Sequence, residues 1–166
     1  DMYFGNDRMP LLRAAVLRVQ LSKLPAITGA MRRSKYRIRA VLERLPGVRL
    51  RRTLDPAGDT GGFLITTYDD AQTAAEVQRG LLAEGIATWP QGISNVLMTD
   101  FGLHLYYNNV SLVEQRGLAW KLSENRGLGR DASKGACPRA DSLFERSIII
   151  AVPSCLTRED EDDIIR

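Results

Sequence analysis

His104 and the polar side chains that follow it are the residues of this chain best suited to chemistry. His104 is the only histidine, and Tyr106, Tyr107, Asn108 and Asn109 come soon after it. Imidazole, phenol and amide groups in one short stretch give the kind of polar lining that orients a sugar. The alternative is a packed imidazole ring with a satisfied nitrogen. No set of nucleophile, base and orienting group can be assembled around His104.

Positive charge is concentrated in the first third of the chain. Residues 1–52 carry thirteen Lys or Arg against three Asp or Glu, whereas residues 53–166 carry ten against seventeen. Such a split suggests nucleic-acid binding, but charge alone binds phosphate without specificity. We therefore expect the basic residues to decorate the solvated face of a helix, and we do not expect nucleic acid as a partner. The residues concerned are Arg32, Arg33, Lys35, Arg37 and Arg39.

Two further patterns resemble ligand sites but lack the necessary context. The glycine-containing stretch at 127–132 follows no predicted strand, so it is not a dinucleotide fingerprint. The acidic run at 159–163 lacks the glycine turn of a calcium loop and is better interpreted as first-turn charge on a helix. We expect no metal site.

Apolar periodicity predicts a long helix over residues 9–45. The repeating apolar positions are Leu12, Val16, Val19, Leu24, Ile27, Met31, Ile38, Val41 and Leu45. Pro25 interrupts this pattern. Because proline lacks a backbone donor and clashes with the preceding turn, we expect two helices or one sharp kink at residues 23–25. Pro46 and Gly47 end the helical region.

The rest of the chain alternates short strands and helices. We expect strands at 48–52, 62–68, 86–89 and 148–152, a brief extended piece at 103–107, and helices at 69–85, 111–116, 140–146 and from 157 onward. Asp69 and Asp70 offer an N-cap to the helix at 69–85, and Thr157 and Asp160 cap the last helix. Residues 90–102 are expected to be irregular, and residues 117–135 to form a long polar loop. This order predicts an α/β fold in which a small mixed or antiparallel sheet is covered by helices and preceded by a long kinked helix.

Length and composition indicate one compact domain that works inside the cell. A chain of 166 residues is long enough to bury a hydrophobic core and needs no disulfide scaffold. Its two cysteines, Cys137 and Cys155, are too few for a disulfide framework and lack zinc-site spacing. No apolar run approaches the length of about 20 residues that spans a bilayer, and the start is charged where a signal peptide is apolar. We expect a soluble, cytoplasmic protein.

Two separated motifs, Gly5-Asn6-Asp7-Arg8-Met9 and the stretch from Cys137-Pro138 to Leu156-Thr157, carry a resemblance to a known family. The chain resembles the C-terminal part of DegT-type sugar aminotransferases, which are pyridoxal 5'-phosphate enzymes of fold type I. Family members usually carry an acidic residue where Leu11 stands and a glutamine where Arg13 stands. The other matched positions are Ala14, Ala15, Gln20, Leu21, Leu82, Gly85, Ile86, Ala140, Leu143, Arg146, Pro153, Glu159 and Ile164.

The resemblance implies a division of the chain and an activity. Residues 1–47 would be the helical connector from a large N-terminal domain, and residues 48–166 the small C-terminal α/β domain of such an aminotransferase. The complete enzyme would be a homodimer that exchanges an amino group between glutamate or glutamine and a keto sugar.

The resemblance also implies roles for particular residues. In the family, the residue at the position of Asn6 donates to the cofactor phosphate of the neighbouring subunit, a role that suits a neutral amide with two donors. Judged without the resemblance, Asn6 could simply cap the long helix. His104 and Tyr106 would lie near the sugar substrate.

Transamination needs a lysine that forms a Schiff base with the cofactor. In the family, that lysine lies upstream of the position of Asn6, and none of Lys23, Lys35, Lys121 and Lys134 occupies its position. We therefore expect this chain to be inactive alone. The alternative is a standalone basic-helix module that binds a partner or nucleic acid without catalysis.

Overall fold

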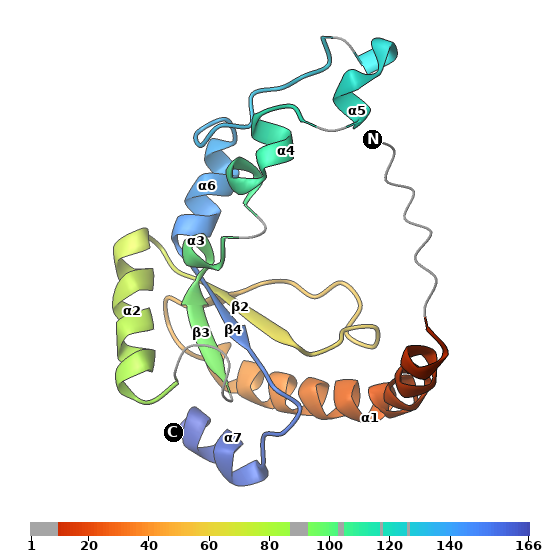
Figure 1. Cartoon of the computed structure of the whole chain (residues 1–166). Helices are drawn as coiled ribbons and strands as arrows, with labels where there is room; N and C mark the ends of the chain where they lie inside the picture. The colour runs from red at the N-terminus through yellow and green to blue at the C-terminus, as the bar shows by residue number, and fades with distance from the viewer. Residues whose placement is uncertain (1–9, 87–92, 103–104, 117, 126) are drawn as a thin grey trace.

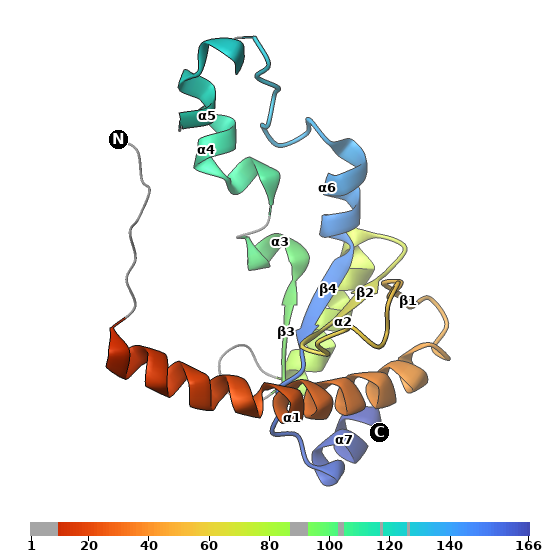
Figure 2. The ribbon, with the colours of Figure 1, turned by 90° about the vertical axis from the view of Figure 1, so that its right-hand side faces the viewer.

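A computed structural model describes residues 10–86, 93–102, 105–116, 118–125 and 127–166 of the chain. Four short strands form one antiparallel sheet with helices against it (Figure 1). The long helix α1, Leu11–Leu42, crosses one end of the sheet, and the described residues between 98 and 145 extend beyond the opposite end (Figure 2). The predicted α/β class, with a small sheet preceded by a long helix, is confirmed.

The sheet is built around its most apolar strand. The strands are β1, Arg49–Leu50; β2, Phe63–Thr67; β3, Ser94–Leu97; and β4, Ser147–Ala151. Their order is β1-β2-β4-β3, and every neighbouring pair is antiparallel. Ile149 at the centre of β4 lies opposite Ile65 on one side and Val96 on the other. The central position suits β4, because an inner strand is buried by neighbours on both sides.

β3 lies within residues 90–102, for which the sequence predicts irregular structure, and that prediction is wrong. Ser94 and Asn95 open the strand, and their side chains are buried. The Nδ2 atom of Asn95 donates to the carbonyl of Ile86 at 2.6 Å, and this bond takes the place of the hydrogen bond to water that the amide loses on burial. Two buried polar residues break the apolar alternation that marks a strand. Ile86 itself is not in a strand, and the rest of the predicted strand at 86–89 lies outside the described residues.

One face of the sheet carries the core. Leu64, Ile148 and Ile150 point to this face and pack against Ala74 of α2, Ala71–Ala83. Asp70 caps α2 as predicted, because its carboxylate accepts from the amide of Thr73 at 2.7 Å, a bond that lowers the pKa of Asp70. The opposite face is less covered. Phe63 there is 45% exposed and meets the ring of Phe101 edge-on at 6.4 Å.

α1 runs without a break through Pro25, so of the two expected outcomes, two helices or one kinked helix, the first is wrong. Figures 1 and 2 show that the helix bends in its middle but continues. A proline inside a helix leaves a carbonyl one turn earlier without its donor. Here, hydroxyl groups donate to carbonyls near the proline, Ser22 to Val19 at 2.7 Å and Thr28 to Leu24 at 3.0 Å. These side-chain bonds supply donors within the bent region of the helix.

A buried ion pair fixes the second half of α1 to the loop before β2. Lys35 is only 4% exposed, and its Nζ atom lies 2.5 Å from Oδ2 of Asp59. The same carboxylate accepts from the Tyr36 hydroxyl at 3.1 Å and the Gly61 amide at 3.0 Å. Burial acts to raise the pKa of Asp59, but the donors from Lys35 and Gly61 outweigh it and the pKa is lowered. Asp59 is therefore ionised at neutral pH and balances the buried ammonium.

The remaining helices are short. They are α3, Met98–Phe101; η1, Tyr106–Asn108; α4, Val110–Val113; α5, Leu118–Lys121; η2, Ser123–Asn125; α6, Pro138–Glu145; and α7, Arg158–Ile165. Three of them, α4, α6 and α7, correspond to predicted helices. The segment 117–135, predicted as one long loop, contains α5 and η2. Thr157 caps α7 as predicted, in a reciprocal capping box with Asp160.

Replacement of Gly61 by alanine tests the contact between the loop and α1. Gly61 has φ +80°, and a Cβ atom there would lie 2.4 Å from the backbone nitrogen of Arg32. We expect Gly61→Ala to lower the free energy of unfolding by about 3 kcal/mol, because the strain of a left-handed residue adds to a backbone overlap.

Gly85→Ala is the matched control. Gly85 has φ +87°, but a Cβ atom there meets nothing within 4 Å. Gly85→Ala should therefore lower the free energy of unfolding only by the conformational strain, about 1 kcal/mol. Urea denaturation of both variants measures the difference, and equal losses would show that the loop does not pack tightly on α1.

Candidate functional site

Tyr106 is the one predicted site residue that the structure describes. Asn6 and His104 lie outside the described residues, so their contacts stay predictions. The extended piece predicted at 103–107 is wrong at Tyr106 and Tyr107, which lie in η1. Leu105 just before them is 3% exposed and anchors this segment.

The Tyr106 hydroxyl is engaged inside the protein. It donates to Oδ2 of Asp141 at 3.0 Å and accepts from the backbone amide of Cys137 at 3.1 Å. Burial raises the pKa of Tyr106, and the neighbouring Asp141 carboxylate raises it further although the Cys137 amide opposes the shift. The phenol therefore stays protonated at neutral pH and acts as a donor. Its bonds hold the segment after α3 against the start of α6.

Asp141 is a candidate functional residue that the sequence did not reveal. It lies in the first turn of α6, is 8% exposed, and accepts from the Gly135 amide at 2.9 Å in addition to Tyr106. Its second oxygen, Oδ1, is buried and has no donor among the described residues. The only signal in the sequence was an acidic residue in the first turn after Cys137-Pro138. A negative charge in the first turn stabilises a helix in any protein, so this signal does not indicate a function.

The described lysines do not offer a cofactor site. Lys35 is held by Asp59, and Lys134 lies 3.6 Å from Glu145 and over the ring of Tyr107. Lys23 and Lys121 are exposed. A Schiff-base lysine is expected in a partly desolvated pocket that lowers its pKa. Among the described residues, no group of three or more His, Cys, Asp or Glu side chains could hold a metal ion.

Of the five basic residues expected on a solvated face of α1, Lys35, Arg37 and Arg39 are paired with carboxylates and only Arg33 is exposed, so that interpretation is wrong. Arg37 donates to Glu161 at 3.0 Å and also bonds Asp162, and Arg39 bonds Glu43 at 2.7 Å. The hydrogen bond that Arg37 donates to Asp162 lowers the pKa of Asp162 and raises the pKa of Arg37. Arg37 thus links the basic helix α1 to the acidic helix α7.

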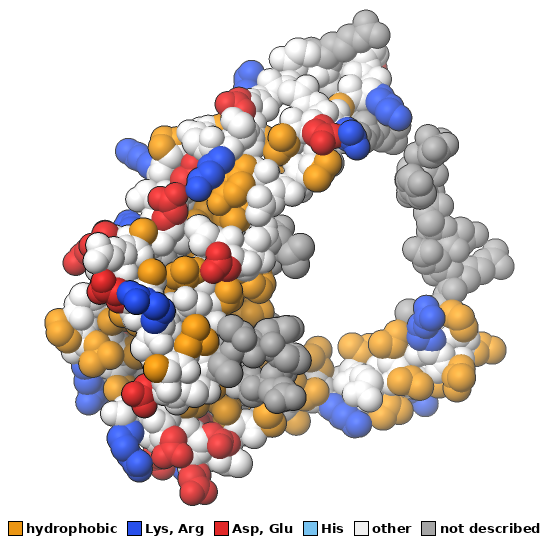
Figure 3. All heavy atoms as spheres, turned by 60° about the vertical axis from the view of Figure 1, so that its left-hand side comes forward, with side chains coloured by type: hydrophobic (Ala, Val, Ile, Leu, Met, Phe, Trp, Pro, Cys, Tyr) orange, Lys and Arg blue, Asp and Glu red, His pale blue; other side chains and the backbone are white. Residues whose placement is uncertain are grey.

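The first half of α1 projects from the domain with its apolar residues uncovered. Leu11 and Leu12 are 90% and 79% exposed, and Val16 and Val19 are 53% exposed each. Figure 3 shows hydrophobic side chains along this projecting part and on the inner side of the curve that the described residues form. Exposed apolar surface of this extent marks an interaction surface more often than a solvated one.

Tyr106→Phe tests the bond to Asp141. Removal of the hydroxyl leaves a buried carboxylate oxygen and the Cys137 amide without one partner each, so we expect a loss of about 1–3 kcal/mol in unfolding free energy. Tyr107→Phe is the control, because the Tyr107 hydroxyl bonds none of the described residues. Thermal unfolding followed by circular dichroism should separate the two variants. Equal unfolding temperatures for the two variants would show that the bond between Tyr106 and Asp141 does not stabilise this segment.

None of the described helices combines the length and the apolar character that crossing a lipid bilayer requires. No model of a known protein family matches the chain.

Solved structures of aminotransferases share this fold. The aminotransferase TlmJ from Streptoalloteichus hindustanus superposes over 93% of this chain with a TM-score of 0.61 at 20% identity. Spr1654 from Streptococcus pneumoniae, described as a sugar aminotransferase and solved in its PMP form, covers 95% with a TM-score of 0.58 at 17% identity. The chain spans 34% of the length of each. It therefore has the fold of the C-terminal domain of an aminotransferase.

Proposed function

We propose that this chain is the C-terminal part of a pyridoxal-phosphate-dependent aminotransferase that acts on a keto sugar, with glutamate or glutamine as the amino donor. The observation that carries the proposal is the match of nearly the whole chain to one third of two aminotransferases. One of the two is described as a sugar aminotransferase in its PMP form, which supports both the cofactor and the sugar. The motif around Asn6 points to the same enzymes without reference to the fold.

The residues that carry out the cofactor chemistry would lie in the part of the enzyme that precedes this chain. The bound pyridoxal phosphate would supply the electron sink for amino-group exchange. The environments of Lys35 and Lys134 support the inference that the essential lysine lies elsewhere. This chain would contribute Asn6 to the cofactor phosphate of the neighbouring subunit, and His104 with the Tyr106 segment to the sugar side. Alone, it should be inactive.

The projecting half of α1 would pack against the large N-terminal domain and the second subunit of a homodimer. Leu11, Leu12, Val16 and Val19 provide an apolar strip on a helix that the domain itself leaves uncovered. Burial of each such side chain contributes about 1.5–3 kcal/mol. The free, exposed Cys137 and Cys155 suit a reducing cytoplasm.

A nucleic-acid role has less support. A phosphate-binding helix presents several unpaired cations along one face. On α1, Lys35, Arg37 and Arg39 are already matched with acidic side chains of the same chain.

Absorbance of a longer protein that contains this chain and its upstream region tests the proposal. Purified with pyridoxal phosphate and dialysed, it should keep an absorption band near the visible edge that shifts when glutamate or glutamine is added. The 166-residue chain treated identically should keep no band. A longer protein that retains no cofactor would overturn the proposal.

Asn6→Asp in that longer protein should weaken cofactor binding. The change replaces two donors by an acceptor-only carboxylate of nearly the same shape, so helix capping survives while the phosphate contact is lost. A lost bond to a charged group in a partly desolvated site is worth about 1–3 kcal/mol, or about 5- to 150-fold in Kd. Equilibrium dialysis against dilute pyridoxal phosphate measures it, and unchanged affinity would assign Asn6 to capping alone.

A further inference from the structure

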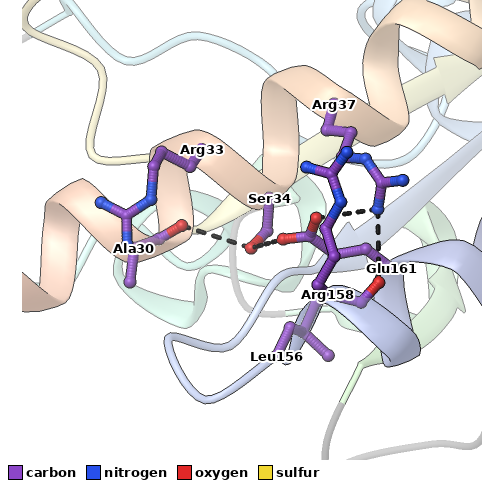
Figure 4. Close-up of a pocket in the computed structure, with 7 residues that line it drawn as sticks. All are labelled: Ala30, Arg33, Ser34, Arg37, Leu156, Arg158 and Glu161. Atoms are coloured by element: carbon purple, nitrogen blue, oxygen red, sulfur yellow. Dashed lines mark hydrogen bonds and ion pairs between the residues drawn. The ribbon is translucent and has the colours of Figure 1, made fainter.

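A surface pocket of about 540 Å³ lies between α1 and α7, away from the Tyr106 segment. Its walls come from two stretches far apart in the sequence, which the packing of α7 against α1 brings together (Figure 4). The lining residues are Ala30, Arg33, Ser34, Arg37, Leu156, Arg158 and Glu161.

The one acidic side chain in this lining is already matched. Glu161 is 8% exposed and accepts from the Ser34 hydroxyl at 2.6 Å and from Arg37 Nη1 at 3.0 Å. Both carboxylate oxygens are therefore used, and the Arg37 cation is shared between Glu161 and Asp162. Glu161 is held as part of the pocket wall and is not available as a counter-ion for other cations.

Two guanidinium groups of the lining make no direct contact with a carboxylate in the described part of the chain, although the charge of Arg158 acts on the nearby Asp162 carboxylate. Neither Arg33 nor Arg158 forms an ion pair with a carboxylate of the described residues. Figure 4 shows them on either side of Ser34, with Arg33 lying back along α1 and Arg158 rising from α7 toward Arg37. Two cations that line one pocket and are bonded to no carboxylate of the described residues can attract an anion that accepts from both.

We propose that this pocket binds the phosphate group of a small molecule through Arg33 and Arg158. A tetrahedral dianion can accept hydrogen bonds from two walls at once, whereas a planar carboxylate presents one edge and a single charge. The small side chain of Ala30 leaves room on α1, and Leu156 gives an apolar patch for a group attached to the phosphate. The volume exceeds that of inorganic phosphate, so a phosphate monoester fits best.

The negative charge of α7 determines which interactions can give the pocket its affinity for an anion. Asp162 bonds Arg37 and interacts with the charge of Arg158, so it adds negative charge beside the pocket. Long-range attraction of an anion is therefore weak. Affinity must come from the short-range donors of Arg33 and Arg158, and it should depend on them more than on net charge.

Calorimetric titration of the 166-residue chain with inorganic phosphate and with phenyl phosphate, at fixed ionic strength, tests the proposal. We expect saturable binding of one ligand per chain. The double variant Arg33→Gln, Arg158→Gln should bind at least about tenfold more weakly, since it loses both charge-assisted contacts. The double variant Arg13→Gln, Arg18→Gln removes the same charge from the projecting half of α1 and should bind as the parent does.

The two ligands distinguish the source of the phosphate. Tighter binding of phenyl phosphate supports a phosphorylated small molecule that uses the patch at Leu156, and equal binding supports recognition of the phosphate group alone. Arg158→Lys keeps the charge but loses the planar guanidinium, so its affinity should lie between that of the parent and that of the double glutamine variant. An intermediate affinity would show that the weaker binding does not come from a folding defect. Absence of saturable binding, or equal losses in the two double variants, would overturn the site.

Discussion

The buried contact between Lys35 and Asp59 is the interaction on which the rest of the structure depends. An ammonium group that is 4% exposed must be paired, because an isolated buried charge costs several kcal/mol. Asp59 supplies that pair and, through the Gly61 amide, sets the backbone that leads into β2. The close approach of Gly61 to the Arg32 backbone then fixes the distance between α1 and the sheet. The direction of the whole helix follows from this one attachment.

That attachment divides α1 into two halves with different roles. The second half packs against the loop and α7, where Arg37 meets the acidic residues of that helix. The first half continues through Pro25 into solvent with its leucines and valines exposed. A helix of this composition gains little from its own hydrogen bonds and is normally stabilised by packing. This apolar strip, together with a fold that matches one third of the length of two solved aminotransferases, supports the proposal that further protein covers it.

Much of the fold could be predicted because local signals agreed with the tertiary structure. The Asp70 cap, the apolar run of β4 and the Thr157 cap each placed an element within a few residues of its observed position. The failures share a physical cause. β3 opens with buried polar residues, and Lys35 is a buried cation, so both owe their environment to partners distant in sequence. The bond from Tyr106 to Asp141 spans 35 residues, and no local pattern encodes such a contact.

Hydrogen exchange along α1 tests the central claim most directly. It should be compared between the 166-residue chain, at a concentration where it is monomeric, and a longer protein that includes its upstream region. We predict that amides of residues 11–27 exchange at least about tenfold more slowly in the longer protein, while residues 30–42, already anchored by Lys35 and α7, change little. Equal exchange of residues 11–27 in the two proteins would contradict the account, because the projecting half of α1 would then have no covering partner in the longer protein.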